Sequence, residues 1–277
     1  MRLSPHPPVK SVVQRNWNES SCRYGLLFLL IMRSSLPVVF LCLTSGFLAS
    51  SFKLMSDQWS KLILTHHWPE TFCIKEQCST DLNYWTLHGL WPNKGAMCNS
   101  SWHFNASQIQ DLMPEMEKYW PDLLSKGPTI STAFWKHEWV KHGTCAASLE
   151  ALDSEHKYFS KALELYQKLD LNGTLRKANI IPRKTNYTLE QIEGAIINHY
   201  AVRPKIQCIQ EQGEEAQILG QIEICFNREF QLMNCENNEY DNWYILNDVL
   251  PSDLYTSGYH VCDQSSPVFY PPLQSKK

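Results

Sequence analysis

The sequence predicts an α+β fold in which helices pack on an antiparallel sheet. Four runs rich in β-branched and aromatic residues are typical of strands, and segments with helical periodicity lie between them without strict alternation. Such an order favours an antiparallel sheet over repeated strand–helix–strand units. No internal repeat and no Gly/Ser-rich or Pro-rich linker divides residues 52–277, so we expect one domain there.

The strand predictions cover residues 60–68, 83–91, 217–226 and 229–234. One helix is predicted over 155–171, where apolar residues recur at helical spacing up to Asn172-Gly173. A second is predicted over 188–200, because Thr188 followed three residues later by Gln191 is a capping-box pattern.

Residues 1–51 are predicted to be an N-terminal extension with a secretory signal peptide, the signal proper covering 32–51. An apolar run at 36–50 follows Arg33, and small residues at Ala49 and Ser51 favour cleavage after Ser51. Met32 could itself be the start codon. A membrane anchor at 25–50, and so a membrane-tethered ectodomain, is the alternative; Arg33 and Ser34-Ser35 interrupt that stretch and leave each half too short to span. We therefore expect a protein exported through the endoplasmic reticulum, secreted or lysosomal, without a membrane segment after processing.

Cysteine usage agrees with export. Eight cysteines follow residue 51, an even number that predicts about four disulfides. No CxxC pair is present, which argues against a zinc ribbon. Four Asn-x-Ser/Thr sequons are candidate glycosylation sites: Asn99, Asn105, Asn172 and Asn186.

The charge balance excludes a general binder of polyanions. Residues 52–277 carry 20 Lys and Arg against 27 Asp and Glu, whereas proteins that bind nucleic acid broadly are basic. Any nucleic-acid chemistry must therefore be local, or must work at acidic pH, where carboxylates and histidines gain protons.

The segment FWKHEWVKHGTC, residues 134–145, combines charged and aromatic residues. As a helix over 134–143 it places Glu138, Lys141 and His142 on one face, while Trp135 and Trp139 form a stripe that can be buried. A solvated, salt-bridged helix is the simpler interpretation of this segment alone. A zinc-protease site is disfavoured, because His137 and His142 are five apart, about 140° around an α-helix.

A second segment, LHGLWP at 87–92, supplies another histidine. Gly89 allows a tight backbone turn beside His88, and Pro92 fixes the exit, so His88 is predicted to be held at a strand end. Two histidines with near-neutral pKa values are what concerted acid–base catalysis uses. A disulfide between Cys98 and Cys145, which follow the two segments, would tie them together.

Together the two segments resemble the paired active-site motifs of the ribonuclease T2 family, vertebrate secreted and lysosomal acid endoribonucleases. The resemblance runs from about Trp59 to Pro272 and includes HHWPETFC (66–73), YWPDLL (119–124), PKIQC (204–208) and PVFYPP (267–272). It implies the T2 fold and cleavage of single-stranded RNA, but not DNA, by attack of the ribose 2'-OH on phosphorus, through a 2',3'-cyclic phosphate. It implies no metal and no cofactor, and we expect a monomer.

The resemblance also implies roles for residues. His142 is the base and His88 the acid, although the reverse stays open. Lys141 and a protonated His137 stabilise the phosphate charge, and Glu138 orients His142 or, when protonated, donates to a phosphoryl oxygen. The implied disulfides are Cys73–Cys78, Cys98–Cys145, Cys208–Cys262 and Cys225–Cys235.

Base recognition is implied for Trp91, Phe134 and Asn93. Trp91 and Phe134 match positions that contact the bases on either side of the cut, although a core tryptophan is an equally good interpretation of Trp91. Asn93 stands where much of the family has an acid. From the two histidines and the acidic composition we predict an acidic pH optimum. The alternative function is a secreted RNA-binding or signalling protein of this fold without activity, against which the intact set of His88, Glu138, Lys141 and His142 argues.

Overall fold

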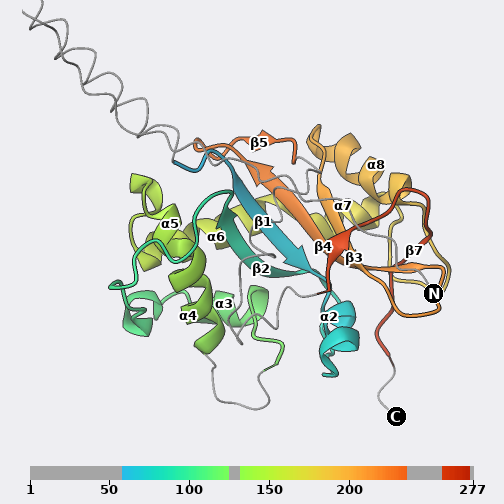
Figure 1. The fold of residues 1–277 in the computed structure, drawn as a ribbon, viewed down its shortest axis with the longest axis horizontal. Helices are drawn as coiled ribbons and strands as arrows, with labels where there is room; N and C mark the ends of the chain where they lie inside the picture. The colour runs from blue at the N-terminus through green and yellow to red at the C-terminus, as the bar shows by residue number, and fades with distance from the viewer. Residues whose placement is uncertain (1–57, 125–131, 236–257, 275–277) are drawn as a thin grey trace, which may run out of the picture. The chain divides into compact units, whose positions relative to one another are not determined.

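The computed structural model describes residues 58–124, 132–235 and 258–274 of the 277-residue chain, so the predicted extension and signal peptide lie outside it. Within those ranges seven strands form one sheet in the order β2-β1-β4-β3-β6, and β5 and β7 also pair with β4. Every pairing is antiparallel except β4 with β7. Figure 1 shows this sheet with helices around it, which confirms the α+β prediction. The strands are β1 Leu62–His67, β2 Thr86–Pro92, β3 Lys205–Ile209, β4 Gln217–Phe226, β5 Leu232–Met233, β6 His260–Val261 and β7 Val268–Phe269.

The strand predictions differ in how well they meet these bounds. The prediction over 217–226 coincides with β4, and the run at 60–68 contains β1; β2 begins three residues later than the run at 83–91 and ends one residue beyond it, at Pro92. The run at 229–234 is a strand over only two residues, β5, because its pairing with β4 covers only Cys225 and Phe226. The short β5 therefore pairs only with the last two residues of β4, and it adds no buried strand to the sheet.

Helices lie on the sheet and at its ends. The described helical segments are α2 Pro69–Glu76, η1 Ala106–Ile109, α3 Met113–Tyr119, α4 Ala133–Glu138, η2 Trp139–Gly143, α5 Thr144–Ala146, η3 Glu150–Leu152, α6 Glu155–Leu169, α7 Leu171–Lys177 and α8 Leu189–Tyr200. The capping box predicted at the start of α8 is present, with Thr188 and Gln191 exchanging side-chain and backbone hydrogen bonds. None of the described helices is long and apolar enough to cross a membrane.

The predicted end of the helix over 155–171 was wrong by two residues. Asp170 adopts a left-handed conformation (φ 42°) that ends α6, and its side chain accepts a hydrogen bond from the Gly173 N–H at the start of α7. A Cβ on Gly173 would lie 2.1 Å from the Asp170 carboxylate. Asn172-Gly173 therefore opens a second helix instead of closing the first.

The two faces of the sheet have different chemistry. Leu62 and Leu64 of β1 belong to the main apolar core, against which α6 packs through Tyr158 and Phe159. The other face of the same strand carries Ile63 and the polar residues Thr65 and His67. One face of the sheet thus packs on the apolar core, and the other carries a row of polar side chains that are also buried.

The disulfides join the four pairs implied by the resemblance, Cys73–Cys78, Cys98–Cys145, Cys208–Cys262 and Cys225–Cys235. Cys98–Cys145 links the loop after β2 to α5. Beside it, the Met97 N–H donates to the Lys141 carbonyl at 2.9 Å. The loop after the segment at 87–92 is therefore fastened to the helical segment that contains His142.

Candidate active site

His88 lies in the middle of β2, at a β-bulge. Along the ladder with β1, Thr65 pairs with Gly89 while the next residue, His66, pairs with Leu87, which leaves His88 as the additional residue. In a regular strand His88 would face the same side as Leu90, in the apolar core. The bulge instead turns it to the polar face, where it meets His67. Bulges often redirect a side chain beside an active site in this way.

Gly89 provides space rather than the tight turn that the sequence suggested. It lies within β2, and His88 is not at a strand end. A Cβ on Gly89 would lie 2.0 Å from Trp91 Nε1 and 2.2 Å from Glu138 Oε2, both far inside van der Waals contact. The missing side chain therefore lets the indole and the carboxyl lie against the strand.

The second histidine, His142, lies on a π-helical turn. The predicted helix over 134–143 is α-helical only as far as Glu138; η2, from Trp139 to Gly143, is a π-helix. Its i→i+5 hydrogen bonding widens the turn, so His137 and His142 come nearer to one face than the 140° separation expected of an α-helix. A Cβ on Gly143 would lie 2.2 Å from the Trp139 ring, so this glycine is needed for Trp139 to pack. Trp135 and Trp139 are both buried, as predicted.

Trp91 lies between the two catalytic segments. Its ring stacks on His142 with centroids 5.1 Å apart and meets His88 edge-on at 4.8 Å. Its Nε1 donates a 2.8 Å hydrogen bond to Glu138 Oε2. The indole also packs against Ile63 and the Cys225–Cys235 disulfide. The structure thus gives Trp91 a central packing position, and base stacking by it stays a prediction.

The ring of His88 is enclosed by side chains from several elements. His67 stacks on it with centroids 5.1 Å apart, and Phe134 lies at 6.0 Å. Gln221 of β4 lies with its Nε2 3.0 Å from His88 Nδ1, and Trp120 Nε1 donates to the His88 carbonyl at 2.6 Å. Neither His67 nor Gln221 could be identified as a site residue from local sequence, because their approach to His88 depends on the register of β1 and β4, which pairs these two residues.

Burial and neighbouring cations both lower the pKa values of His88 and His142. Desolvation lowers the pKa of His88 well below its ordinary value, and His67, His137 and Lys141 lower it further. The pKa of His142 is likewise well below its ordinary value because of burial, Lys141 and His137. Both histidines therefore favour the neutral form until acid or a phosphate anion stabilises the charged one.

The pKa of Glu138 is raised, whereas those of the two histidines are lowered. Burial raises its pKa to about 8, and the Trp91 hydrogen bond and Lys141 only partly oppose that rise. Only 1% of Glu138 is exposed. The carboxyl is therefore protonated at acidic pH and can donate a hydrogen bond, which is one of the two roles expected of it.

Asn93 holds the end of β2 to the start of β1. Its Oδ1 accepts hydrogen bonds from the N–H groups of Ser60 and Lys61 at 2.9 and 3.0 Å, and its own N–H donates to the Lys61 carbonyl. Both acceptor positions of the amide oxygen are thus used by the backbone. Any base contact through Asn93 would have to use Nδ2, and this role stays a prediction, as does that of Phe134, which is buried beside His88.

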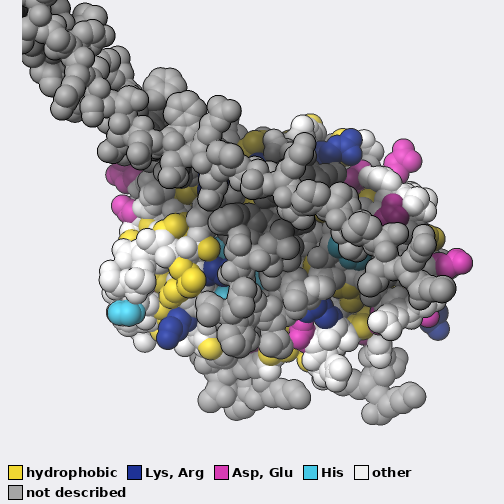
Figure 2. Space-filling view, viewed as in Figure 1, with side chains coloured by type: hydrophobic (Ala, Val, Ile, Leu, Met, Phe, Trp, Pro, Cys, Tyr) yellow, Lys and Arg dark blue, Asp and Glu magenta, His cyan; other side chains and the backbone are white. Residues whose placement is uncertain are grey.

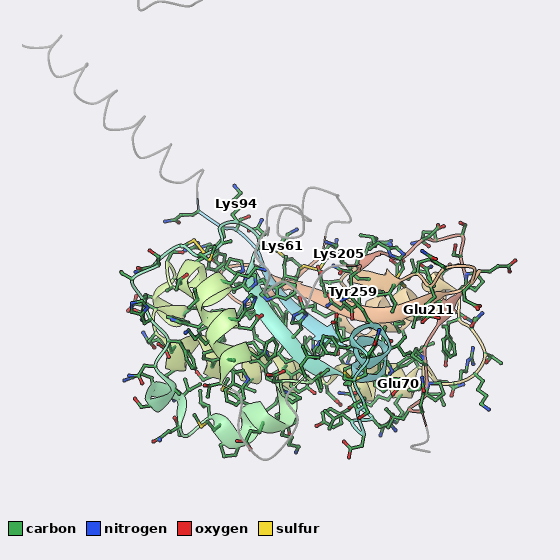
Figure 3. All side chains as sticks on the ribbon, turned by 60° about the horizontal axis from the view of Figure 1, so that its bottom comes forward. Lys61, Glu70, Lys94, Lys205, Glu211 and Tyr259 are labelled. Carbon is green, nitrogen blue, oxygen red and sulfur yellow. A yellow bond between two sulfur atoms is a disulfide. The ribbon has the colours of Figure 1, made fainter. Side chains whose placement is uncertain are left out.

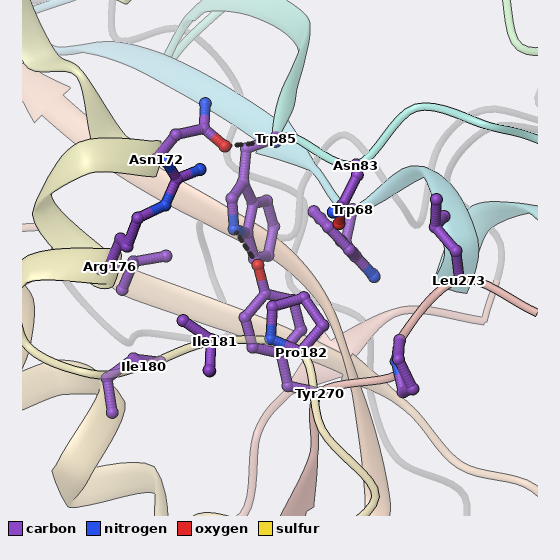
Figure 4. Close-up of a pocket in the computed structure, with 12 residues that line it drawn as sticks. Trp68, Asn83, Trp85, Asn172, Arg176, Ile180, Ile181, Pro182, Tyr270 and Leu273 are labelled. Carbon is purple, nitrogen blue, oxygen red and sulfur yellow. Dashed lines mark hydrogen bonds between the residues drawn. The ribbon is translucent and has the colours of Figure 1, made fainter.

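The described residues hold no group of three or more His, Cys, Asp or Glu side chains placed to bind a metal ion. A cavity of about 370 Å³ lies away from the histidines, lined by Trp68, Trp85 and Tyr270 among others (Figure 4). Inside it, Trp85 Nε1 donates to the Tyr270 hydroxyl, and Asn172 Oδ1 accepts from the backbone N–H of Trp85.

Comparison with known proteins agrees with this geometry. The model of the ribonuclease T2 family matches residues 59–235, and the chain belongs to that family. A zebrafish (Danio rerio) protein named ribonuclease T2 is 57% identical over 240 residues, covering 86% of this chain and 95% of its own length. Human ribonuclease T2 is 44% identical over 248 residues, covering 86% and 94%. The crystal structure of human RNase T2 covers 78% of this chain and 100% of its own with a TM-score of 0.64.

The fold, the family and these relatives establish an endoribonuclease of the T2 type. Of the five residues to which the resemblance gives a role at the phosphate, His88, Glu138 and His142 meet at Trp91, while Lys141 and His137 act electrostatically on both histidines; these roles stay predictions. Trp91 joins their two segments by contacts with His88, Glu138 and His142.

Proposed function

We propose that the protein cleaves single-stranded RNA without a metal ion, by attack of the ribose 2'-OH on the adjacent phosphorus. The observation that supports this proposal is that His88 and His142 both contact the ring of Trp91, with Glu138 bonded to the same indole. His142 takes the 2'-OH proton and His88 gives a proton to the leaving 5'-oxygen. The products are a 2',3'-cyclic phosphate and a free 5'-OH, and DNA is not cut because it lacks the nucleophile.

Lys141 and His137 stabilise the charge that develops on the phosphoryl oxygens. Both act electrostatically on His88 and on His142, which supports a role near the phosphate. Protonated Glu138 adds a hydrogen-bond donor without adding a negative charge, because its pKa is raised to about 8. The site is therefore suited to an anion although the chain as a whole is acidic.

The pH optimum is acidic. The acid in this mechanism must be protonated, and desolvation keeps the pKa of His88 well below its ordinary value. A bound phosphate raises that pKa only in part, so the rate falls as pH rises towards neutrality. The alkaline limb of the pH–rate profile reports this group.

The protein is exported, and it works outside the cell or in the lysosome. Its four disulfides support passage through an oxidising compartment, and one relative bears the name extracellular ribonuclease LE, from tomato (Solanum lycopersicum). Asn99, Asn105 and Asn186 are exposed candidates for glycosylation, whereas Asn172 is half-buried on α7. The active form is a monomer without a membrane segment.

The decisive experiment incubates the purified exported protein with single-stranded RNA at about pH 5 in the presence of EDTA. We expect cleavage with 2',3'-cyclic phosphate ends, lost in His88→Ala and in His142→Ala, and no cleavage of DNA of the same sequence. Intact RNA with the wild type would favour the binding or signalling alternative, and inhibition by EDTA would overturn the metal-independent mechanism.

A further inference from the structure

Gln221, a buried glutamine of β4, reaches His88 from the centre of the sheet. Its Nε2 lies 3.0 Å from His88 Nδ1, and each of the two residues is 1% exposed. In the ladders on either side, Gln221 pairs with His67 of β1 and with Gln207 of β3, so its backbone is fixed from both directions. A bulge at Gly220 in the pairing with β3 directly precedes it.

We propose that Gln221 is a positioning residue for the reaction: it holds His88 through Nδ1, so that Nε2 is the nitrogen that delivers the proton to the leaving 5'-oxygen. The inference rests on the proposed function. As the P–O5' bond breaks, the Nε2–H bond of protonated His88 breaks and an O5'–H bond forms. His142 has meanwhile received the 2'-OH proton, so charge and protons balance over the step.

The ring contacts alone do not determine which nitrogen faces the substrate. His67 and Phe134 lie along the faces of the His88 ring, and Trp91 meets it edge-on. These apolar contacts fix the plane of the ring, but they do not distinguish Nδ1 from Nε2. A hydrogen bond to Nδ1 does, because in neutral imidazole the nitrogen that accepts leaves the proton on the other one.

A glutamine suits a histidine that changes its protonation state. The amide Nε2–H donates to neutral Nδ1, and after a half-turn the amide Oε1 accepts from Nδ1–H of the imidazolium. Unlike a carboxylate, the amide adds no negative charge that would retain the proton on His88. The charged and titratable groups that act on His88 are His67, His137, Lys141 and Lys75, all of which lower its pKa.

The carboxylate nearest to Gln221 along β4, that of Glu223, interacts with other side chains. Glu223 accepts a hydrogen bond from Gln207 Nε2, and Lys205 Nζ, labelled in Figure 3, lies 3.8 Å from Glu223 Oε2. These three side chains are buried. The sheet therefore presents a neutral amide to His88 and pairs the neighbouring charge with a cation.

The test compares Gln221→Leu and Gln221→Glu with Gln217→Leu. Gln217 is a matched control, since it lies in the same strand with the same 1% exposure, and its side chain bonds the Asp263 and Ser266 carbonyls instead of a histidine. We expect Gln221→Leu to lower kcat by about tenfold to a hundredfold with little change in KM, as a slightly misplaced catalytic group does. Gln221→Glu should move the alkaline limb of the pH–rate profile upward by about one unit or more. Gln217→Leu should lower the melting temperature while keeping kcat and the profile.

Histidine ring ¹H–¹⁵N spectra provide a readout independent of activity. Neutral His88 should be the Nε2–H tautomer in the wild type and a tautomer mixture in Gln221→Leu. An Nδ1–H tautomer in the wild type overturns the inference, as does an unchanged kcat and pH profile in both Gln221 variants. If either of these results is found while the wild type cleaves RNA and His88→Ala does not, only the inference about Gln221 fails. If the wild type does not cleave RNA, the proposed function and the inference fail together.

Discussion

Replacement of His66 by leucine tests how this fold responds to acid. His66 is fully buried on the core face of β1, stacked on Tyr166 at 5.5 Å, with Nδ1 3.3 Å from the Ile222 carbonyl. Desolvation lowers its pKa from 6.5 to about 4. Because the unfolded chain binds the proton at higher pH than the folded one, stability is complete above pH 6.5 and is lost as pH falls towards 4.

The size of the effect follows from that shift. Each unit of pKa difference corresponds to about 1.4 kcal/mol, so between pH 7 and pH 5 this one histidine lowers the free energy of unfolding by about 2 kcal/mol. Leucine cannot titrate, and its altered packing and lost hydrogen bond change stability by nearly the same amount at both pH values. The difference between the two pH values therefore isolates the protonation of His66.

The assay is urea-induced unfolding with disulfides intact, followed by tryptophan fluorescence at pH 7 and pH 5 after reversibility has been shown. We expect the wild type to lose about 2 kcal/mol more than His66→Leu between these pH values. His199→Gln, at an exposed position of α8, is the control and should keep the wild-type dependence. If the change in unfolding free energy between pH 7 and pH 5 differs by less than about 0.5 kcal/mol between the wild type and His66→Leu, the reasoning about the buried histidine is wrong.

Three further predictions concern the site and the surface. Gly89→Ala forces Trp91 and Glu138 aside; we expect a loss of about 1–3 kcal/mol from overpacking and of about a hundredfold in kcat/KM, whereas Gly194→Ala, which meets nothing within 4 Å, should keep full activity. Asn93→Asp keeps the acceptor for two backbone N–H groups and should preserve the melting temperature. Because it replaces the Nδ2 donor with an acceptor, it should change the base preference in cleavage of dinucleoside substrates; an unchanged preference would remove Asn93 from base recognition. Asn99→Gln should remove the mass of one glycan from the exported protein, and an unchanged mass would show that the site is unused.

Local patterns were sufficient for much of the fold. The β-branched and aromatic residues of 217–226 predicted β4 to the residue, and the capping box predicted the start of α8. Both depend on interactions among near neighbours in the chain. Asp170 shows the limit of such patterns, since its left-handed conformation joins two helices where the sequence suggested one helix and a stop.

The chemistry of the site could also be predicted, but its geometry could not. The two histidine segments were identified from their residues, whereas the bulge at His88 depends on pairing with β1 and has no local signature. Gly89 was predicted to allow a tight turn, whereas it provides space for Trp91 and Glu138. Glu138 is remote in the chain, so local sequence could not indicate this role. Gln221 could not be found at all from sequence, since only the register between β1 and β4 brings it to the histidines.

The described basic side chains on the face drawn in Figure 2 are scattered among acidic and apolar ones, and the formal net charge of the chain is -3, so we expect weak attraction of RNA over long distances. Under the proposed mechanism, long polyanions are engaged mainly where phosphate meets Lys141 and His137. We therefore expect the affinity for RNA to depend on salt less steeply than that of proteins with extended basic surfaces.

The Cys98–Cys145 disulfide has a consequence for the cell that makes this enzyme. It fastens the loop after His88 to the helix that follows His142, so the alignment of the two proposed catalytic histidines depends on an oxidised bond. In the cytosol, glutathione and thioredoxin keep thiols reduced. We therefore expect a molecule retained in the cytosol to lose this bond, and to cleave the cell's own transcripts less efficiently than the exported protein cleaves RNA.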